Sequence, residues 1–106
     1  MSWMFYKCSS LTNINLSYFD TNNVINLSGI FNGCSSLEEL NLSNFITNNI
    51  NYMNWMFRKC SSLTNINLSN FNTNNVKYIS GIFSGCKKLN KDKIITKDKK
   101  ILENYD

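Results

Sequence analysis

The side chains best suited to chemistry in this chain are four cysteines, which recur with a constant period of 26. They are Cys8, Cys34, Cys60 and Cys86. A cysteine nucleophile needs a neighbouring base, and a zinc site usually combines cysteine with histidine or with a C-x-x-C pair. The chain has no histidine and no C-x-x-C pair. The spacing therefore predicts a structural cysteine ladder rather than a reactive site.

Three states of this cysteine ladder stay open. Copies on stacked strands would lie about 4.8 Å apart, which is near enough for a disulfide. Similarly oriented side chains in a ladder rarely present the disulfide dihedral, however, and free cysteine is a good small core residue. We expect free buried thiols, with a disulfide as the second alternative and a zinc site as the last.

The carboxylates do not predict an acid–base pair. Residues 1–86 contain only Asp20, Glu38 and Glu39. Sequential residues on a strand point to opposite or splayed sides, so Glu38 and Glu39 would make a poor acid–base pair. Exposed charges at a strand edge explain them more simply. We therefore expect no enzyme, no catalytic residue, no metal and no cofactor.

The cysteine spacing is one part of a repeat that runs through the chain. Blocks of the same period begin at Met1, Leu27, Met53 and Ile79 without any insertion. Two further positions are the same in every block, namely Phe5, Phe31, Phe57, Phe83 and Leu11, Leu37, Leu63, Leu89. A fixed period between roughly 20 and 50 residues is typical of stacked repeat architectures.

Each block predicts one strand and one helix. Leu11, Ile14 and Leu16 end in a period of two, which is typical of a short strand with polar residues facing outward. A polar turn follows at 21–23. Apolar residues in 24–34 then recur at the spacing of one helical face. The predicted fold class is α/β, a right-handed leucine-rich-repeat-like solenoid of four strand-turn-helix repeats with parallel strands on one face.

The strand motif resembles the leucine-rich repeat pattern L-x-x-L-x-L. It reads LTNINLS at 11–17 and LEELNLS at 37–43. The longer block MFxxCSSLxxxNLSxFxTNNV, at 4–24 and in its copies, resembles more narrowly the BspA-like leucine-rich repeats, which include a repeat of unknown function in mycoplasma-type surface lipoproteins. This resemblance covers about residues 1–90.

The resemblance implies a bacterial or protist protein that binds other proteins or mediates adhesion. It also implies a place at the cell surface or outside the cell, as part of a longer protein. The start of this chain has no basic segment followed by an apolar core, so no secretory signal is predicted in it. A cytoplasmic location stays open.

One corner of the repeat departs from the leucine-rich repeat pattern. Phe19 and its copies stand where Asn or Cys commonly forms a side-chain ladder. We expect Thr21, together with Asn22 or Asn23, to supply that ladder instead.

The predicted repeats end at residue 89. They comprise 1–26, 27–52, 53–78 and a partial copy at 79–89. Residues 87–106 carry seven lysines against four acidic residues, and so hold most of the net charge of +4. Asp92 stands where an inward Ile is expected, and Ile94 recovers the pattern. Residues 90–106 are predicted to be a C-terminal cap or a frayed lysine-rich tail, with a short helix around 101–102.

The outward positions of the predicted strands form the candidate binding face. They are Thr12, Asn13, Asn15, Ser17, Glu38, Glu39, Asn41, Ser43, Thr64, Asn65, Asn67 and Ser69. Solenoids bind partners on such extended faces. Because this face is rich in hydroxyls and amides and has no aromatic anchor, we expect weak or multivalent polar contacts with a protein or cell-surface macromolecule.

Two other functions stay open. The chain could be a structural spacer or stalk that associates end to end, or an intracellular module with a basic tail. We expect no nucleic-acid partner, because a solvated terminus explains the lysines more simply. We also expect no transmembrane segment, since no apolar run approaches the roughly 18 residues that a bilayer requires.

The tryptophans recur at twice the period of the cysteines. Trp3 and Trp55 occupy a position at which the alternate blocks have Gly29 and Gly81. An exposed indole could mark a contact site. We favour the interpretation that each tryptophan packs over the small glycine of the neighbouring turn.

Overall fold

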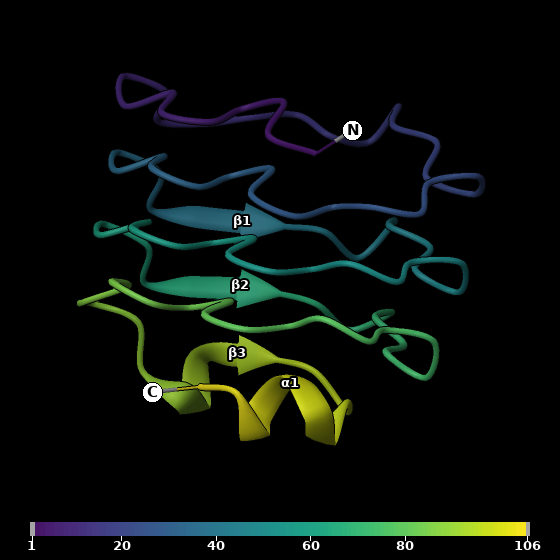
Figure 1. The fold of residues 1–106 in the computed structure, drawn as a ribbon. Helices are drawn as coiled ribbons and strands as arrows, with labels where there is room; N and C mark the ends of the chain where they lie inside the picture. The colour runs from purple at the N-terminus through teal and green to yellow at the C-terminus, as the bar shows by residue number, and fades with distance from the viewer. Residues whose placement is uncertain (1, 106) are drawn as a thin grey trace.

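A computed structural model describes residues 2–105, and Figure 1 shows them as layers stacked in chain order. Each layer corresponds to one of the blocks of the sequence repeat. Strands β1 (Glu39–Asn41), β2 (Asn65–Asn67) and β3 (Ile94–Ile95) form one parallel sheet in the order β1-β2-β3. A 3-10 turn, η1 (Lys91–Lys93), precedes β3, and the helix α1 (Lys99–Glu103) follows it. Each layer thus contributes at most one short strand, and α1 lies at the C-terminal end of the stack.

The sheet register follows the sequence repeat. Leu40 of β1 lies beside Ile66 of β2, which is its copy in the next block. The isolated parallel bridge between Tyr52 and Tyr78 joins another pair of copies. Ile66 then pairs with Ile94, whereas the repeat alone would have paired it with Asp92. The turn η1 takes up the two additional residues, so that Ile94 resumes the apolar pattern that Asp92 interrupts.

The helix that we predicted over 24–34 is not formed, and neither are its copies. This segment contains consecutive turns instead. Gly29 and Gly33 have φ values of +64° and +82°, which a right-handed helix cannot include. Trp55 and Lys59 occupy the same positions of the next layer with φ values of 57° and 60°. The strand-turn-helix description of the repeat is therefore wrong for its helical part.

The backbone amides of these turns alternate between two kinds of partner. The Asn32 amide donates within its own turn to the carbonyl of Gly29, at 3.0 Å. The Phe31 amide donates to the carbonyl of Met56 in the next layer, also at 3.0 Å. Every second amide thus joins two layers, and this is the bonding that a helix would have used for its own ladder. The wider solenoid assignment stays a prediction.

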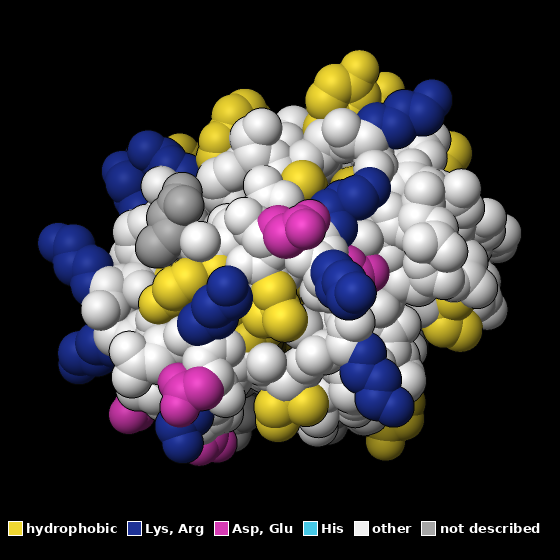
Figure 2. Space-filling view, turned by 90° about the horizontal axis from the view of Figure 1, so that it is seen from below, with side chains coloured by type: hydrophobic (Ala, Val, Ile, Leu, Met, Phe, Trp, Pro, Cys, Tyr) yellow, Lys and Arg dark blue, Asp and Glu magenta, His cyan; other side chains and the backbone are white. Residues whose placement is uncertain are grey.

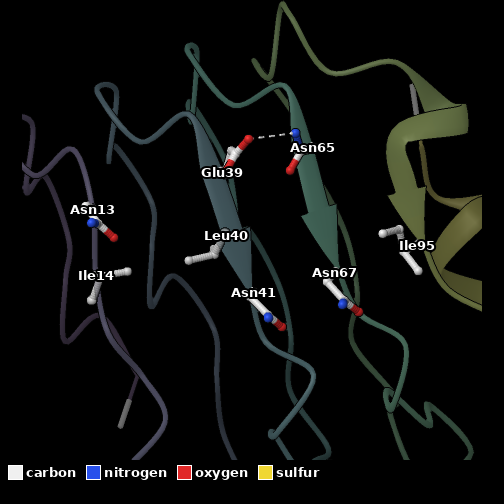
Figure 3. A pocket seen from close by; sticks show the side chains of 8 residues that line it. All are labelled: Asn13, Ile14, Glu39, Leu40, Asn41, Asn65, Asn67 and Ile95. Atoms are coloured by element: carbon white, nitrogen blue, oxygen red, sulfur yellow. Dashed lines mark hydrogen bonds between the residues drawn. The ribbon is translucent and has the colours of Figure 1, made fainter.

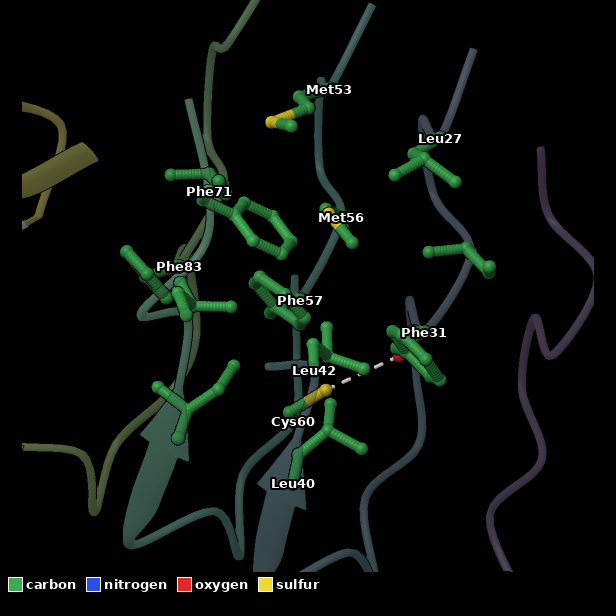
Figure 4. Close-up of a cluster of buried hydrophobic side chains, with 14 of the residues drawn as sticks. Leu27, Phe31, Leu40, Leu42, Met53, Met56, Phe57, Cys60, Phe71 and Phe83 are labelled. Atoms are coloured by element: carbon green, nitrogen blue, oxygen red, sulfur yellow. Dashed lines mark hydrogen bonds between the residues drawn. The ribbon is translucent and has the colours of Figure 1, made fainter. Parts of the chain in front are cut away.

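The core lies between the sheet and the turns. Leu42, Met53, Met56, Phe57 and Ile66 are all completely buried (Figure 4). Through this core runs a stack of phenylalanines at one repeat position, Phe5, Phe31, Phe57 and Phe83, whose successive ring centroids are 5.5, 5.9 and 5.6 Å apart. Identical side chains pack on one another in this way because the layers have the same length.

The C-terminal segment packs against the last layer. Ile101 of α1 is completely buried, and the Tyr105 hydroxyl donates to the Leu89 carbonyl. Asp98 caps α1 by accepting a hydrogen bond from the Ile101 amide at 3.2 Å. The short helix predicted around 101–102 is confirmed, and Asp106 lies outside the described residues. The division of the chain into repeats and cap stays a prediction.

Candidate binding face and cysteine ladder

The twelve residues predicted to form the binding face are all exposed or half-buried. They lie on β1, on β2 and on the chain that flanks these strands or stands at the equivalent place in the first layer. Leu40 and Ile66, between them in sequence, are 4% and 0% exposed, so the strands alternate as the sequence predicts. The binding of a partner to this face stays a prediction.

The middle of this face has a shallow hollow of about 360 Å³ (Figure 3). It is lined by Asn13, Ile14, Glu39, Leu40, Asn41, Asn65, Asn67 and Ile95. The Asn65 amide donates to Glu39 Oε1 at 3.3 Å, which links the second and third layers. Sequence reasoning missed Ile95, which is 54% exposed and adds an apolar edge. The sequence signal for this apolar edge was the second isoleucine of the pair 94–95, because the repeat pattern requires only one inward isoleucine there.

Three asparagines of the predicted face have a structural role that sequence reasoning also missed. Each one accepts a hydrogen bond, through its side-chain oxygen, from the backbone amide of the serine two residues later. The pairs are Asn15–Ser17 at 3.0 Å, Asn41–Ser43 at 2.9 Å and Asn67–Ser69 at 3.0 Å. This turn ends each strand. The NH₂ groups of these asparagines make no hydrogen bond within residues 2–105 and are free to face a partner.

A threonine ladder lies at the corner after the strands, as predicted. The Thr47 hydroxyl donates to the Asn72 carbonyl at 2.9 Å and accepts from the Asn72 amide at 2.8 Å. Thr21 makes the same pair of bonds with Ile46. The Thr73 hydroxyl instead donates to the carboxylate of Asp98 at 2.8 Å, so the Asp98 side chain ends the ladder.

The four cysteines are free and stand in line with the phenylalanine stack. The Cys60 thiol donates to the Phe31 carbonyl of the preceding layer at 3.2 Å (Figure 4). Cys34 and Cys86 make equivalent bonds at 3.1 and 3.0 Å. Each of these three thiols thus satisfies a carbonyl inside the core, which is a structural use of cysteine.

Burial also makes these thiols poor nucleophiles. Loss of water around the sulfur raises the pKa of Cys34 and of Cys86 to about 11, and burial raises the pKa of Cys60 further. Near neutral pH the groups stay protonated, whereas the thiolate is the reactive form. Among residues 2–105, no three Cys, Asp or Glu side chains gather where they could hold a metal ion.

Each tryptophan packs over a glycine of the neighbouring layer, which confirms the favoured interpretation. A Cβ atom on Gly29 would lie 2.3 Å from Cε3 of Trp3. On Gly81 it would lie 2.8 Å from Cδ1 of Trp55. Both indoles are nevertheless about two-fifths exposed, at 41% and 42%. The doubled period of the tryptophans therefore has a steric cause, because an indole in one layer requires glycine in the next.

The lysine-rich segment combines structural and solvated charges. Figure 2 views the end of the stack at which this segment lies, with Lys and Arg side chains spread around it and Asp and Glu among them. Lys100 Nζ donates to the carbonyls of Val76 at 2.9 Å and Thr73 at 3.2 Å. No helix within residues 2–105 has the length and apolar character needed to span a membrane.

Comparison with known proteins finds a family for this chain. Residues 1–103 match the family described as "Mycoplasma protein of unknown function, DUF285". No curated protein and no solved structure matches the chain. The matched region includes all the layers and ends with α1, so the repeats and the helix that covers their last layer occur within one family unit.

Proposed function

The chain belongs to this mycoplasma family of unknown function, and on that premise we propose that it is a BspA-like leucine-rich repeat module of a cell-surface protein. In this proposal it is a solenoid of tandem repeats that binds a protein or another cell-surface macromolecule and catalyses no reaction. The exposed polar face carries the proposal. Adhesion is the biological role that such a face would serve.

The spacing of this face supports a binding role. Asn13, Glu39 and Asn65 stand at one position of three successive layers, and the last two are paired in the sheet. Neighbouring strands lie about 4.8 Å apart, so the row offers a polar group at each step. An extended partner can contact one group in every layer, and several weak contacts then add to a useful affinity.

A pair of matched variants tests this role. Beads coated with the full chain are applied to cultured animal cells, and the bound beads are counted. Asn13→Glu with Asn65→Glu adds two carboxylates to the row beside Glu39. Asn22→Glu with Asn74→Glu adds the same charge at exposed turn positions away from the strand face.

We expect the first variant to lose most of the binding and the second to retain it, because like charges disrupt only the face that contacts the partner. Thermal unfolding of both variants checks that the fold is retained. Equal binding by the two variants and the parent chain would show that the strand face is not the contact surface.

End-to-end association is a second candidate function, and the first layer favours it. Phe5, Leu11 and Phe19 of this layer are only half-buried, whereas their copies in the second layer are completely buried. Residues 90–105 cover the other end, so contact between two first layers would give a closed dimer rather than a filament. Sedimentation velocity over a range of concentrations distinguishes a dimer from a monomer, and a strict monomer would exclude this role for the chain.

A further inference from the structure

A second exposed site lies on the turns, away from the strand face. It is a shallow cavity of about 340 Å³, which is within the range of small-ligand sites. It is lined by Trp3, Tyr6, Asn32, Trp55 and Arg58. These residues come from the turns of three successive layers, at two positions whose residue differs between adjacent blocks. Neither the proposed function nor the strand face uses them.

Aromatic rings form one wall of this cavity. The ring centroids of Trp3 and Trp55 are 6.3 Å apart with their planes at 36°. Tyr6 meets Trp3 edge to face, at 5.2 Å and 86°. The two indoles come together over Gly29, since any side chain there would meet Trp3. Rings this close cannot hold a ligand between them, so they present a continuous apolar platform.

The backbone beneath this platform is strained. Trp3 and Trp55 have φ values of 60° and 57°. Gly29 and Gly81 occupy the same turn position at 64° and 62°, where glycine has no steric cost. A bulky residue in this conformation is a true outlier, and such strain is characteristic of functional positions. The indoles are thus present where glycine would fold more easily.

Two polar side chains of the cavity have no partner among residues 2–105. Asn32 is 3% exposed, yet its side-chain amide makes no hydrogen bond with those residues. Every side-chain nitrogen or oxygen atom that is fully enclosed within residues 2–105 has a hydrogen-bond partner. The Asn32 amide has none, so it is not fully enclosed and it reaches the cavity that Asn32 lines. The Arg58 guanidinium likewise forms no hydrogen bond or ion pair with those residues. No carboxylate of the described residues lines the cavity, and Lys7 Nζ lies 5.2 Å from the Tyr6 ring centre.

We propose that this cavity binds a carboxylated pyranose, such as a uronic acid unit of an acidic glycan. The C–H face of the sugar lies on the indoles, whose negative ring faces attract its polarised hydrogens. The Arg58 guanidinium binds the carboxylate through two parallel hydrogen bonds, and the Asn32 amide binds a hydroxyl. The positive charge of Arg58 and Lys7 repels a cationic ligand. An apolar peptide would leave Asn32 and Arg58 unpartnered.

Intrinsic fluorescence reports on this site alone, because the only two tryptophans of the chain line it. The probe is a tetrasaccharide of alternating glucuronic acid and N-acetylglucosamine, titrated into the full chain. Its carboxyl-reduced form is the matched neutral control. We expect a saturable fluorescence change with the acidic form, about tenfold weaker binding of the neutral form, and weaker binding as salt rises.

Two variants use residues that other layers already have at these positions. Trp55→Gly copies Gly29 and Gly81 and suits the positive φ, so it should fold and lose binding of both sugars. Arg58→Ser copies Ser84 and should bind the acidic sugar no better than the neutral one. The Asn13→Glu and Asn65→Glu variant of the strand face should bind the sugar normally. The proposal would be overturned if neither sugar changed the fluorescence, if both sugars bound equally well, or if Arg58→Ser bound the acidic sugar as the parent chain does. A fluorescence change with apolar peptides alone would also overturn it.

Discussion

Replacing Gly29 with alanine should destabilise the fold far more than the same replacement at Gly33. Both glycines lie in one turn segment and both have positive φ, +64° and +82°. They differ in what an added methyl group would meet. At Gly29 the new Cβ lies 2.3 Å from the Trp3 indole, whereas at Gly33 it lies 3.2 Å from Cα and Cγ of Lys7. Both variants thus share the backbone strain, and Gly29→Ala adds the more severe steric conflict.

The magnitude follows from these two terms. A residue with a side chain in the left-handed region costs about 1–2 kcal/mol, and this applies to both variants. Gly29→Ala must in addition displace an indole from its packed position, and overpacking of this kind costs about 1–3 kcal/mol. We expect Gly29→Ala to lose about 2–5 kcal/mol of unfolding free energy, against about 1–2 kcal/mol for Gly33→Ala.

Urea unfolding followed by circular dichroism measures these free energies without relying on the tryptophans. In a Trp3→Gly background the steric term disappears, so Gly29→Ala should then cost only the backbone term. The double-mutant cycle should give a coupling of about 1–3 kcal/mol between the two positions. Equal losses for Gly29→Ala and Gly33→Ala, or no rescue by Trp3→Gly, would refute the stacking of indole over glycine.

Four further outcomes follow from the structure. Because burial holds the pKa of Cys34 and Cys86 at about 11, iodoacetamide should label these two thiols of the native chain slowly at pH 8 and faster toward pH 11. Mass spectrometry that finds rapid labelling of either one at pH 8 would contradict their burial. Since these pKa values lie above the ordinary value of 9.0, unfolding free energy should be fully retained below pH 9 and should fall as pH rises toward 11. Asp98→Ala removes both the cap of α1 and the partner of Thr73, so urea unfolding should show a loss of about 1–3 kcal/mol, and an unchanged midpoint would argue against this closure of the ladder. Far-UV circular dichroism should show little helix, because α1 has five residues, and a strong helical signal would contradict the turns.

The register of the layers could be predicted because the repeat has no insertion. Residues that recur at a fixed period must meet their own copies, so Phe31 stacks on Phe57 and Leu40 lies beside Ile66. The alternation of apolar and polar residues then decides which side chains enter the core. The threonine ladder was also predictable, since threonine recurs at the corner where phenylalanine replaces the usual ladder residue.

The turns could not be predicted from apolar spacing alone, because one face of a helix and a series of turns bury residues at similar intervals. Glycine was the missed signal. Gly29 and Gly33 stand four residues apart inside the predicted helix, where each costs about 1 kcal/mol relative to alanine. Trp55 and Lys59 obscured this signal, because neither residue type suggests a positive φ.

Of the residues that line the aromatic cavity, the sequence drew attention only to the two tryptophans, and it did so because they recur. A repeat directs attention to residues that are copied, whereas this site uses positions that vary. Tyr6, Asn32, Arg58 and Ser84 occupy one position of the four blocks. The aligned blocks alone are enough to show that the residue at this position differs in every block.

The stacking of layers through their turns is the central claim, and scalar couplings across hydrogen bonds test it most directly. The Trp55 amide donates to the Ser80 carbonyl of the next layer at 2.9 Å, and the Gly29 amide donates to the Asn54 carbonyl at the same distance. Long-range NMR correlation experiments on the isotope-labelled chain should therefore connect the Trp55 nitrogen to the carbonyl carbon of Ser80. A correlation to the carbonyl of Asn51, four residues earlier in the same layer, would show a helix and contradict the account.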